Sequence, residues 1–283
     1  MHAISPIDLG EQLRQDIADN HIQLPTLPEI ALRVRDAVEN EAADAHEVAE
    51  LVTNDAALSA RLIQVANSPL YRGRVPIDNV QMAVTRMGLK LVKSLVISLA
   101  MKQIFQATSD ALDAAFRKVW ETSIEVAAIA RVLANNVAGL EPEQAMLAGL
   151  VHNIGCLPIL TKLDELYGFE VDAGMLHDAT ETLSPDIGRL ILEHWHFTDE
   201  LVRVPTDCID LARDSEQPDY ADLVLVARLQ HLASDGKLAG ADAMENWPNY
   251  PAFAKVGLET EVIVLDMEGP AEEIAEVRNM LSS

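Results

Sequence analysis

Apolar residues recur at helical spacing along most of the chain, and short segments rich in Pro, Gly, Asn and Asp separate the repeats. Between residues 26 and 38 the apolar positions fall on one helical face, and Thr26 and Glu29 have capping-box spacing. The same pattern predicts helices that begin after Asp44, Asp55 and Asp78 and others over 89–105, 110–137, 141–152, 156–167, 184–195, 198–212 and 219–234. A chain of this kind predicts an all-α fold.

The breaks in this pattern predict the domain organisation. The step at residues 107–109 separates two groups of helices. We therefore expect an N-terminal helix over 1–20, a helical subdomain over 21–107, a second over 108–235 and a C-terminal helical extension over 236–283. Pro185 is expected at the start of a helix and Pro205 at a break or kink within one. Residues 261–265 have a strand-like composition, but their acid-rich neighbours favour short helices.

The composition indicates a folded globular protein. Hydrophobic residues make up 49% and aromatic residues only 4%, a balance that favours helices packed through aliphatic side chains. Two cysteines, Cys156 and Cys208, do not form a disulfide scaffold and fit a reducing compartment. The N-terminus lacks a signal-peptide pattern, and no apolar run approaches the roughly 20 residues of a membrane span. These features predict a cytoplasmic protein that does not associate with membranes.

The net charge of -24 does not favour binding to nucleic acid, because phosphates are repelled. Residues 72–102 are the exception, with six basic residues and one acid. This excess is explained either by solvated helix faces or by a surface for an acidic protein partner, a phosphorylated ligand or a cyclic nucleotide. The candidate binding residues are Arg72, Arg74, Arg86, Lys90 and Lys93.

Six segments carry a resemblance to a known family. They are Leu-Pro-Thr-Leu-Pro-Glu at 24–29, Asp55–Leu62, Val65–Tyr71, Ala83–Leu89, Gly-Leu-Val-His-Asn-Ile-Gly at 149–155, and Ile187–Trp195. Over residues 20–235 the chain resembles the HDOD domain, a degenerate relative of the HD and HD-GYP metal-dependent phosphohydrolases. The resemblance implies a multi-helical fold in two packed subdomains and a role in bacterial signal transduction. A protein partner in a signalling pathway is then expected.

The resemblance also implies which positions would hold metal in an active HD enzyme. In this chain they are Thr122, His152, Asn153, Ser184, Cys208 and Arg228. Asn153 offers a neutral oxygen where the enzymes have a carboxylate, and Arg228 brings a permanent positive charge. Divalent metals need anionic oxygen ligands, so we expect no bound metal, no cofactor and no catalytic residue. We also expect Arg228 to lie near the vacant metal position and to replace its charge.

Two other interpretations remain open. The first is a metal-dependent phosphohydrolase with a rearranged site, in which His152 and a divalent metal recruit Asp178 or Asp186. The second is a structural scaffold whose pocket is filled by side chains. His152 is also explained as a satisfied core histidine at a helix C-terminus.

Several other residues have simpler explanations. His177, followed by an Asp, is a chance His-Asp pair in a predicted loop, and His194 and His196 point to different faces of a helix end. The two cysteines are expected to be inert core thiols. Gly155, like Gly73 and Gly88, is expected at a turn or helix cap, and no Gly-rich phosphate loop is present.

Overall fold

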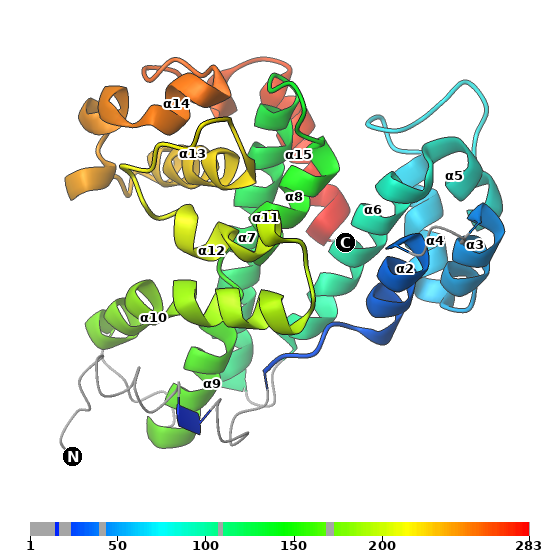
Figure 1. The fold of residues 1–283 in the computed structure, drawn as a ribbon, viewed down its shortest axis with the longest axis horizontal. Helices are drawn as coiled ribbons and strands as arrows, with labels where there is room; N and C mark the ends of the chain where they lie inside the picture. The colour runs from blue at the N-terminus through cyan, green and yellow to red at the C-terminus, as the bar shows by residue number, and fades with distance from the viewer. Residues whose placement is uncertain (1–14, 17–23, 40–43, 107–109, 168–172, 283) are drawn as a thin grey trace.

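The computed structural model describes residues 15–16, 24–39, 44–106, 110–167 and 173–282 of the chain (Figure 1). These residues form helices, turns and loops and include no strand, so the predicted all-α fold is confirmed. The residues predicted to form the first helix and the boundary at 107–109 lie mainly outside the described part.

The first group of helices, blue to teal in Figure 1, contains α2 to α6. Their bounds are Glu29–Glu39, Ala45–Thr53, Ala56–Ala66, Val80–Met87 and Leu89–Met101, followed by the 3₁₀ helix η1 over Lys102–Phe105. Helix α2 packs on α3 and α6, and α5 packs on α3, α4 and α6. Val34, Val48 and Leu62 are fully buried between them. The apolar positions that indicate α2, α3 and α4 in the sequence therefore include residues that are buried in the fold.

The caps of these helices agree in part with the predictions. Asp44 and Asp55 cap α3 and α4 through their side chains, as predicted. Helix α5 is capped by Asn79 and not by Asp78, because Asn79 has the extended backbone of an N-cap and accepts a bond from the Met82 amide. Helix α2 begins at Glu29, later than the predicted capping box, because the Pro28 carbonyl accepts its first bonds.

The second group of helices is built around α7. It contains α7 (Asp110–Ala134), α8 (Pro142–Val151), α9 (Cys156–Tyr167), α10 (Ala173–His194), α11 (Asp199–Val202), α12 (Val204–Asp207) and α13 (Tyr220–Ser234). Helix α7 packs on α8, α9, α13 and the C-terminal helix. Gly149 of α8 lies so close to Ala127 of α7 that a Cβ there would be 2.4 Å from the Ala127 Cα. The two helices therefore approach through their backbones.

The structure corrects two helix predictions in this group. Helix α10 does not start at Ser184; it begins eleven residues earlier and contains Pro185 in its interior. Its packing against α9 and α12 outweighs the backbone bond that Pro185 cannot donate. The predicted helix over 198–212 is instead two short helices, α11 and α12, and it ends at Asp207.

The C-terminal residues form short helices and no strand. They are η2 (Gly240–Asp242), η3 (Met244–Asn249), α14 (Pro251–Val256), η4 (Val264–Asp266) and α15 (Pro270–Ser282). Helix α14 packs on α13, and α15 packs on α7. Helix α15 also contacts the first group, because Arg61 donates to the Met280 carbonyl at 2.9 Å. The extension is therefore part of the core and joins both groups.

Two polar contacts link segments far apart in the sequence. The Trp195 indole donates to the Pro25 carbonyl at 2.8 Å, and the Arg35 guanidinium donates to the Trp195 carbonyl. Arg35 is 6% exposed. The end of α10 is therefore fixed to the segment that enters α2.

A second polar cluster connects the loop after α4 to the second group. Buried Arg131 pairs with Glu143 at 3.1 Å and with Glu273, and it lies 5.4 Å from the centre of the Tyr71 ring. Tyr71 donates to the same Glu143 carboxylate at 3.0 Å. Because Tyr71 ends the Val65–Tyr71 segment, that segment serves to join the two helical groups.

One stretch, Pro142–Leu166, is long and apolar enough to cross a membrane by length and composition alone. It comprises α8 and α9, and 78% of its most apolar window is buried inside the fold. Such burial is typical of core helices in globular proteins.

Candidate functional site

A cavity of about 530 Å³ lies between α7, α9, α10 and α13. Its lining includes all six positions predicted from the family pattern: Thr122, His152, Asn153, Ser184, Cys208 and Arg228. They come from five helices or helix ends that are separated by up to 106 residues of sequence. The fold therefore brings these positions together at one site.

The cavity has a buried inner end and an exposed rim. His152, Ser184 and Cys208 are 7%, 6% and 1% exposed and form the inner end. The rim carries His177 and Glu181 from α10, which are exposed, with Lys237 after α13. The cavity thus extends from exposed rim residues to the buried residue His152.

His152 follows the last residue of α8 and turns its Nδ1 towards the Gly149 carbonyl at 2.6 Å. A carbonyl oxygen can only accept, so Nδ1 carries the proton and Nε2 is left with a free lone pair. Burial, with the positive charge of Arg228 as a second cause, lowers the pKa of His152 to about 3. The imidazole is therefore neutral, and Nε2 is an acceptor at the inner end of the cavity.

Asn153 is held by α7. Its Oδ1 accepts from the Ser123 hydroxyl at 2.7 Å, and its Nδ2 donates to the Val119 carbonyl at 3.4 Å. The amide thus fixes the turn between α8 and α9 against α7. It contributes no charge to the cavity.

Arg228 of α13 lines the same cavity and donates from Nη1 to the Cys208 carbonyl at 2.8 Å. Its positive charge lowers the pKa of His152. The same charge lowers the pKa of the Cys208 thiol and so offsets part of the increase that burial causes. The inner end of the cavity is consequently electropositive.

Both cysteines lie at this cavity as neutral thiols. Burial raises the pKa of Cys156 and of Cys208 to about 11. The Cys156 thiol donates to the Ser184 hydroxyl at 3.3 Å. A thiol with so high a pKa is a poor nucleophile near neutral pH.

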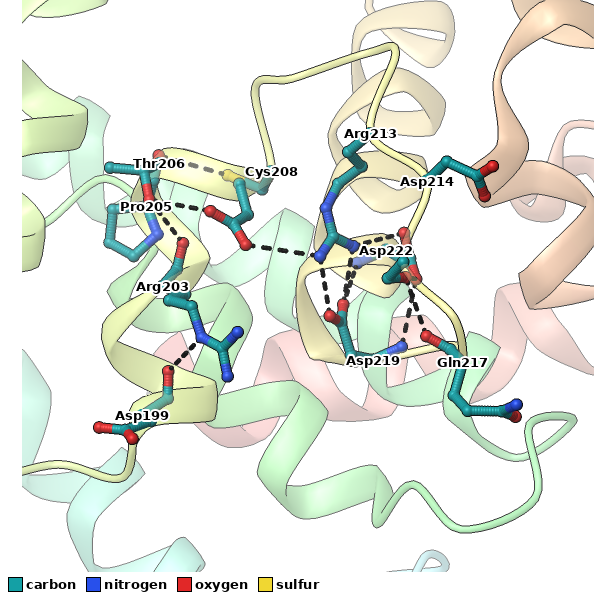
Figure 2. Close-up of polar contacts among 12 residues, drawn as sticks. Asp199, Arg203, Pro205, Thr206, Cys208, Arg213, Asp214, Gln217, Asp219 and Asp222 are labelled. Atoms are coloured by element: carbon teal, nitrogen blue, oxygen red, sulfur yellow. Dashed lines mark hydrogen bonds and ion pairs between the residues drawn. The ribbon is translucent and has the colours of Figure 1, made fainter.

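A cluster around Arg213 supports the segment between α12 and α13 (Figure 2). Nη1 and Nη2 of Arg213 each donate to one carboxylate oxygen of Asp219, both at 2.8 Å. Arg213 also forms ion pairs with Asp222 and Asp207. Asp222 is 0% exposed and forms a capping box with Asp219 at the start of α13. The cluster fixes the segment that begins with Cys208, whose carbonyl holds Arg228.

The donor set does not fit a divalent metal. The inner end offers one neutral imidazole, one engaged amide and a cation, whereas hard dications require several anionic oxygens. Throughout the described part of the chain, no group of three or more His, Cys, Asp or Glu side chains is arranged to hold an ion. Asp178 and Asp186 are exposed on α10 and are not among the residues that line the cavity.

Several residues that line the cavity are not among the candidates from the sequence. The sequence predicts a loop at His177 and a chance His-Asp pair, but His177 lies on α10 and lines the cavity. His231 lies one helical turn after Arg228, a spacing that could have revealed it. Lys237 and Asp242 lie after α13, and no sequence signal connects them to the site.

The five basic candidates lie outside this cavity. Arg72, Arg74 and Lys90 are exposed. Arg86 donates to the Val75 carbonyl, and Lys93 lies 3.7 Å from Glu39. The last two side chains therefore have partners within the fold.

Comparison with known proteins gives one family and several similar structures. A family model for the HDOD domain matches residues 24–207. A solved structure of a proposed metal-dependent phosphohydrolase from Shewanella amazonensis is 32% identical and covers 98% of this chain and 99% of its own, with a TM-score of 0.84.

More distant relatives share the fold. An HDOD domain protein of unknown function from Geobacter sulfurreducens is 21% identical, with 98% of each chain covered and a TM-score of 0.67. A proposed signal transduction protein from Marinobacter aquaeolei is 21% identical, with 99% of this chain and 69% of its own covered and a TM-score of 0.65. An uncharacterized protein of Treponema pallidum is 21% identical over 203 residues, which are 68% of this chain. The chain spans 38% of the length of that curated relative.

Proposed function

Because the chain belongs to the HDOD domain family, we propose that it is a bacterial regulatory module that works by binding and does not hydrolyse phosphoesters. The observation that carries this proposal is the inner end of the cavity. A neutral imidazole, an amide and a guanidinium stand where a phosphohydrolase needs carboxylates around a metal. The name of the Marinobacter relative, a proposed signal transduction protein, supports the same class of function.

The second candidate is a metal-dependent phosphohydrolase with a rearranged site. The name of the Shewanella relative supports it. The placement of Asp178 and Asp186 does not favour it, because both are exposed on α10 outside the cavity lining. A purely structural scaffold is less favoured than either, since this cavity is lined by polar side chains.

Metal analysis combined with a hydrolysis assay distinguishes the first two candidates. We expect protein purified without chelator to hold well below one equivalent of transition metal, and to hydrolyse neither p-nitrophenyl phosphate nor bis-p-nitrophenyl phosphate with Mg²⁺ or Mn²⁺ added. The physical reason is the missing negative charge at the imidazole of His152. The variant N153D/R228D supplies two carboxylates and serves as a gain-of-binding control. One equivalent of metal in the wild type, lost with turnover in H152A, would contradict the proposal.

We propose that the partner is a protein with an acidic surface and that the module acts in the cytoplasm. The exposed cations Arg72, Arg74 and Lys90 support an acidic partner, and the free thiols of Cys156 and Cys208 suit a reducing compartment. No cofactor is included in this proposal.

A charge-reversal comparison tests the surface. We expect R72E/R74E/K90E to lose partners that the wild type captures from lysate of its native cells, because opposite charges would become like charges. Arg189 and Arg203 are exposed on another part of the chain, so R189E/R203E is the matched control. If the wild type and both variants captured the same partners equally, Arg72, Arg74 and Lys90 would not form the binding surface.

A further inference from the structure

The inner end of the cavity contains polar groups that the fold leaves without partners. Arg228 uses Nη1 for the Cys208 carbonyl, and no described residue accepts a hydrogen bond from its Nε or Nη2. No described residue donates to Nε2 of His152, whose other nitrogen is engaged by Gly149. Ser184 accepts from the Cys156 thiol, and its own hydroxyl proton has no acceptor in the described part of the chain. Arg228 is half-buried, and these groups line the cavity, so a ligand or water that enters it can pair with them.

The charged side chains around these groups determine whether the cavity attracts an anion or a cation. Arg228 is the one permanently charged side chain among the six positions of the family pattern that line the cavity. The acids that line the cavity, Glu181 and Asp242, are partly or fully exposed, and Lys237 at the same rim is paired with Asp235. An anion is therefore attracted to the inner end, while the rim acids oppose ligands with several negative charges.

The protonation state of His152 restricts the ligand further. Since Nδ1 donates to Gly149, Nε2 can only accept a hydrogen bond. A bare anion would leave this acceptor unpaired. A ligand that satisfies both Arg228 and His152 must carry anionic oxygens and, next to them, an O–H or N–H donor.

We infer that the cavity binds a small organic oxyanion bearing an adjacent hydrogen-bond donor, without a metal. The guanidinium of Arg228 holds the anionic oxygens, the hydroxyl of Ser184 donates to them, and Nε2 of His152 accepts from the ligand. The volume of about 530 Å³ is that of sites for small metabolites. Phosphate monoesters and hydroxy or amino carboxylates share this chemistry. The inference rests on the proposed function, because it requires a cavity without a dication.

Calorimetric titration in phosphate-free buffer with EDTA tests this site. The probes are adenosine 5′-monophosphate, inorganic phosphate, malate and serine, with adenosine as an uncharged control. We expect saturable one-to-one binding of the phosphate or the carboxylate probes and none of adenosine. R228Q should weaken that binding at least about tenfold, because the variant removes the only fixed charge at the inner end. R228K should retain part of the affinity, since it keeps the charge but loses the planar fork.

A matched variant and a folding check make the result interpretable. R203Q changes an exposed arginine that bonds the Asp199 carbonyl outside the cavity, and it should bind like the wild type. Circular dichroism and the thermal midpoint show whether R228Q is folded. Absence of binding by every anionic probe, or equal affinity in R228Q, would overturn the inference while leaving the proposed function intact. Binding that requires Mn²⁺ and leads to turnover would overturn both.

Discussion

Replacing Gly155 with alanine is expected to lower the free energy of unfolding by about 3–5 kcal/mol. A Cβ at this position would lie 2.1 Å from the Ser184 carbonyl oxygen and 2.6 Å from the Gly188 amide nitrogen. Both are backbone atoms of α10, so no side chain can rotate to relieve the overlap. The start of α9 and α10 would have to separate, which would open the core and displace Ser184 from the cavity. Urea denaturation followed by circular dichroism measures the loss.

Gly73 provides the control for this substitution. A Cβ there would meet only the Arg86 side chain, at 3.5 and 3.9 Å, which is ordinary contact. G73A should therefore stay within about 0.5 kcal/mol of the wild type. If G155A were as stable as G73A, the close approach of α9 and α10 would not exist in solution.

Replacing Arg213 with alanine is expected to cost about 3–5 kcal/mol of stability. Arg213 is 10% exposed and neutralises Asp222, whose side chain is 0% exposed (Figure 2). Without the guanidinium, a buried carboxylate remains in an environment that penalises charge, with Asp219 and Asp207 nearby. Chemical denaturation of the wild type, R213A, D222N and R213A/D222N gives the free energies of unfolding for a double-mutant cycle. The double variant should lose less than the sum of the single losses, because it contains no unpaired buried charge.

Arg203 serves as the comparison for Arg213. Its side chain is exposed and donates to the Asp199 carbonyl at 3.2 Å. R203A should change stability by about 0.5 kcal/mol or less. Similar losses in R213A and R203A would show that the cluster is solvated and does not hold the segment between α12 and α13.

Local signals in the sequence predicted most of the helices. Cys156–Tyr167 is helical over the predicted residues, and α13 covers the predicted 219–234 except for Asp219, which is its N-cap. These features depend on neighbours within one or two turns, which sequence periodicity and capping residues encode directly. The family resemblance also located the positions of the cavity, since its segments lie on the helices that surround it.

The prolines and glycines show where local signals failed. Pro185 predicts a helix start at Ser184, yet α10 continues through it because packing against α9 and α12 compensates for one missing bond. Gly155 looks like an ordinary turn glycine in the sequence. In the structure it is the point where two backbones meet.

The sequence by itself determined most of the helices and the absence of carboxylates at the six positions of the family pattern. The tertiary structure decided which of the remaining polar groups face one another. Only the packing of α10 and α13 places His177, His231 and Arg228 around one cavity, and only the Gly149 carbonyl determines which nitrogen of His152 can accept. Helical periodicity acts over a few residues, whereas charge, burial and proton position at a site depend on segments that are distant along the chain.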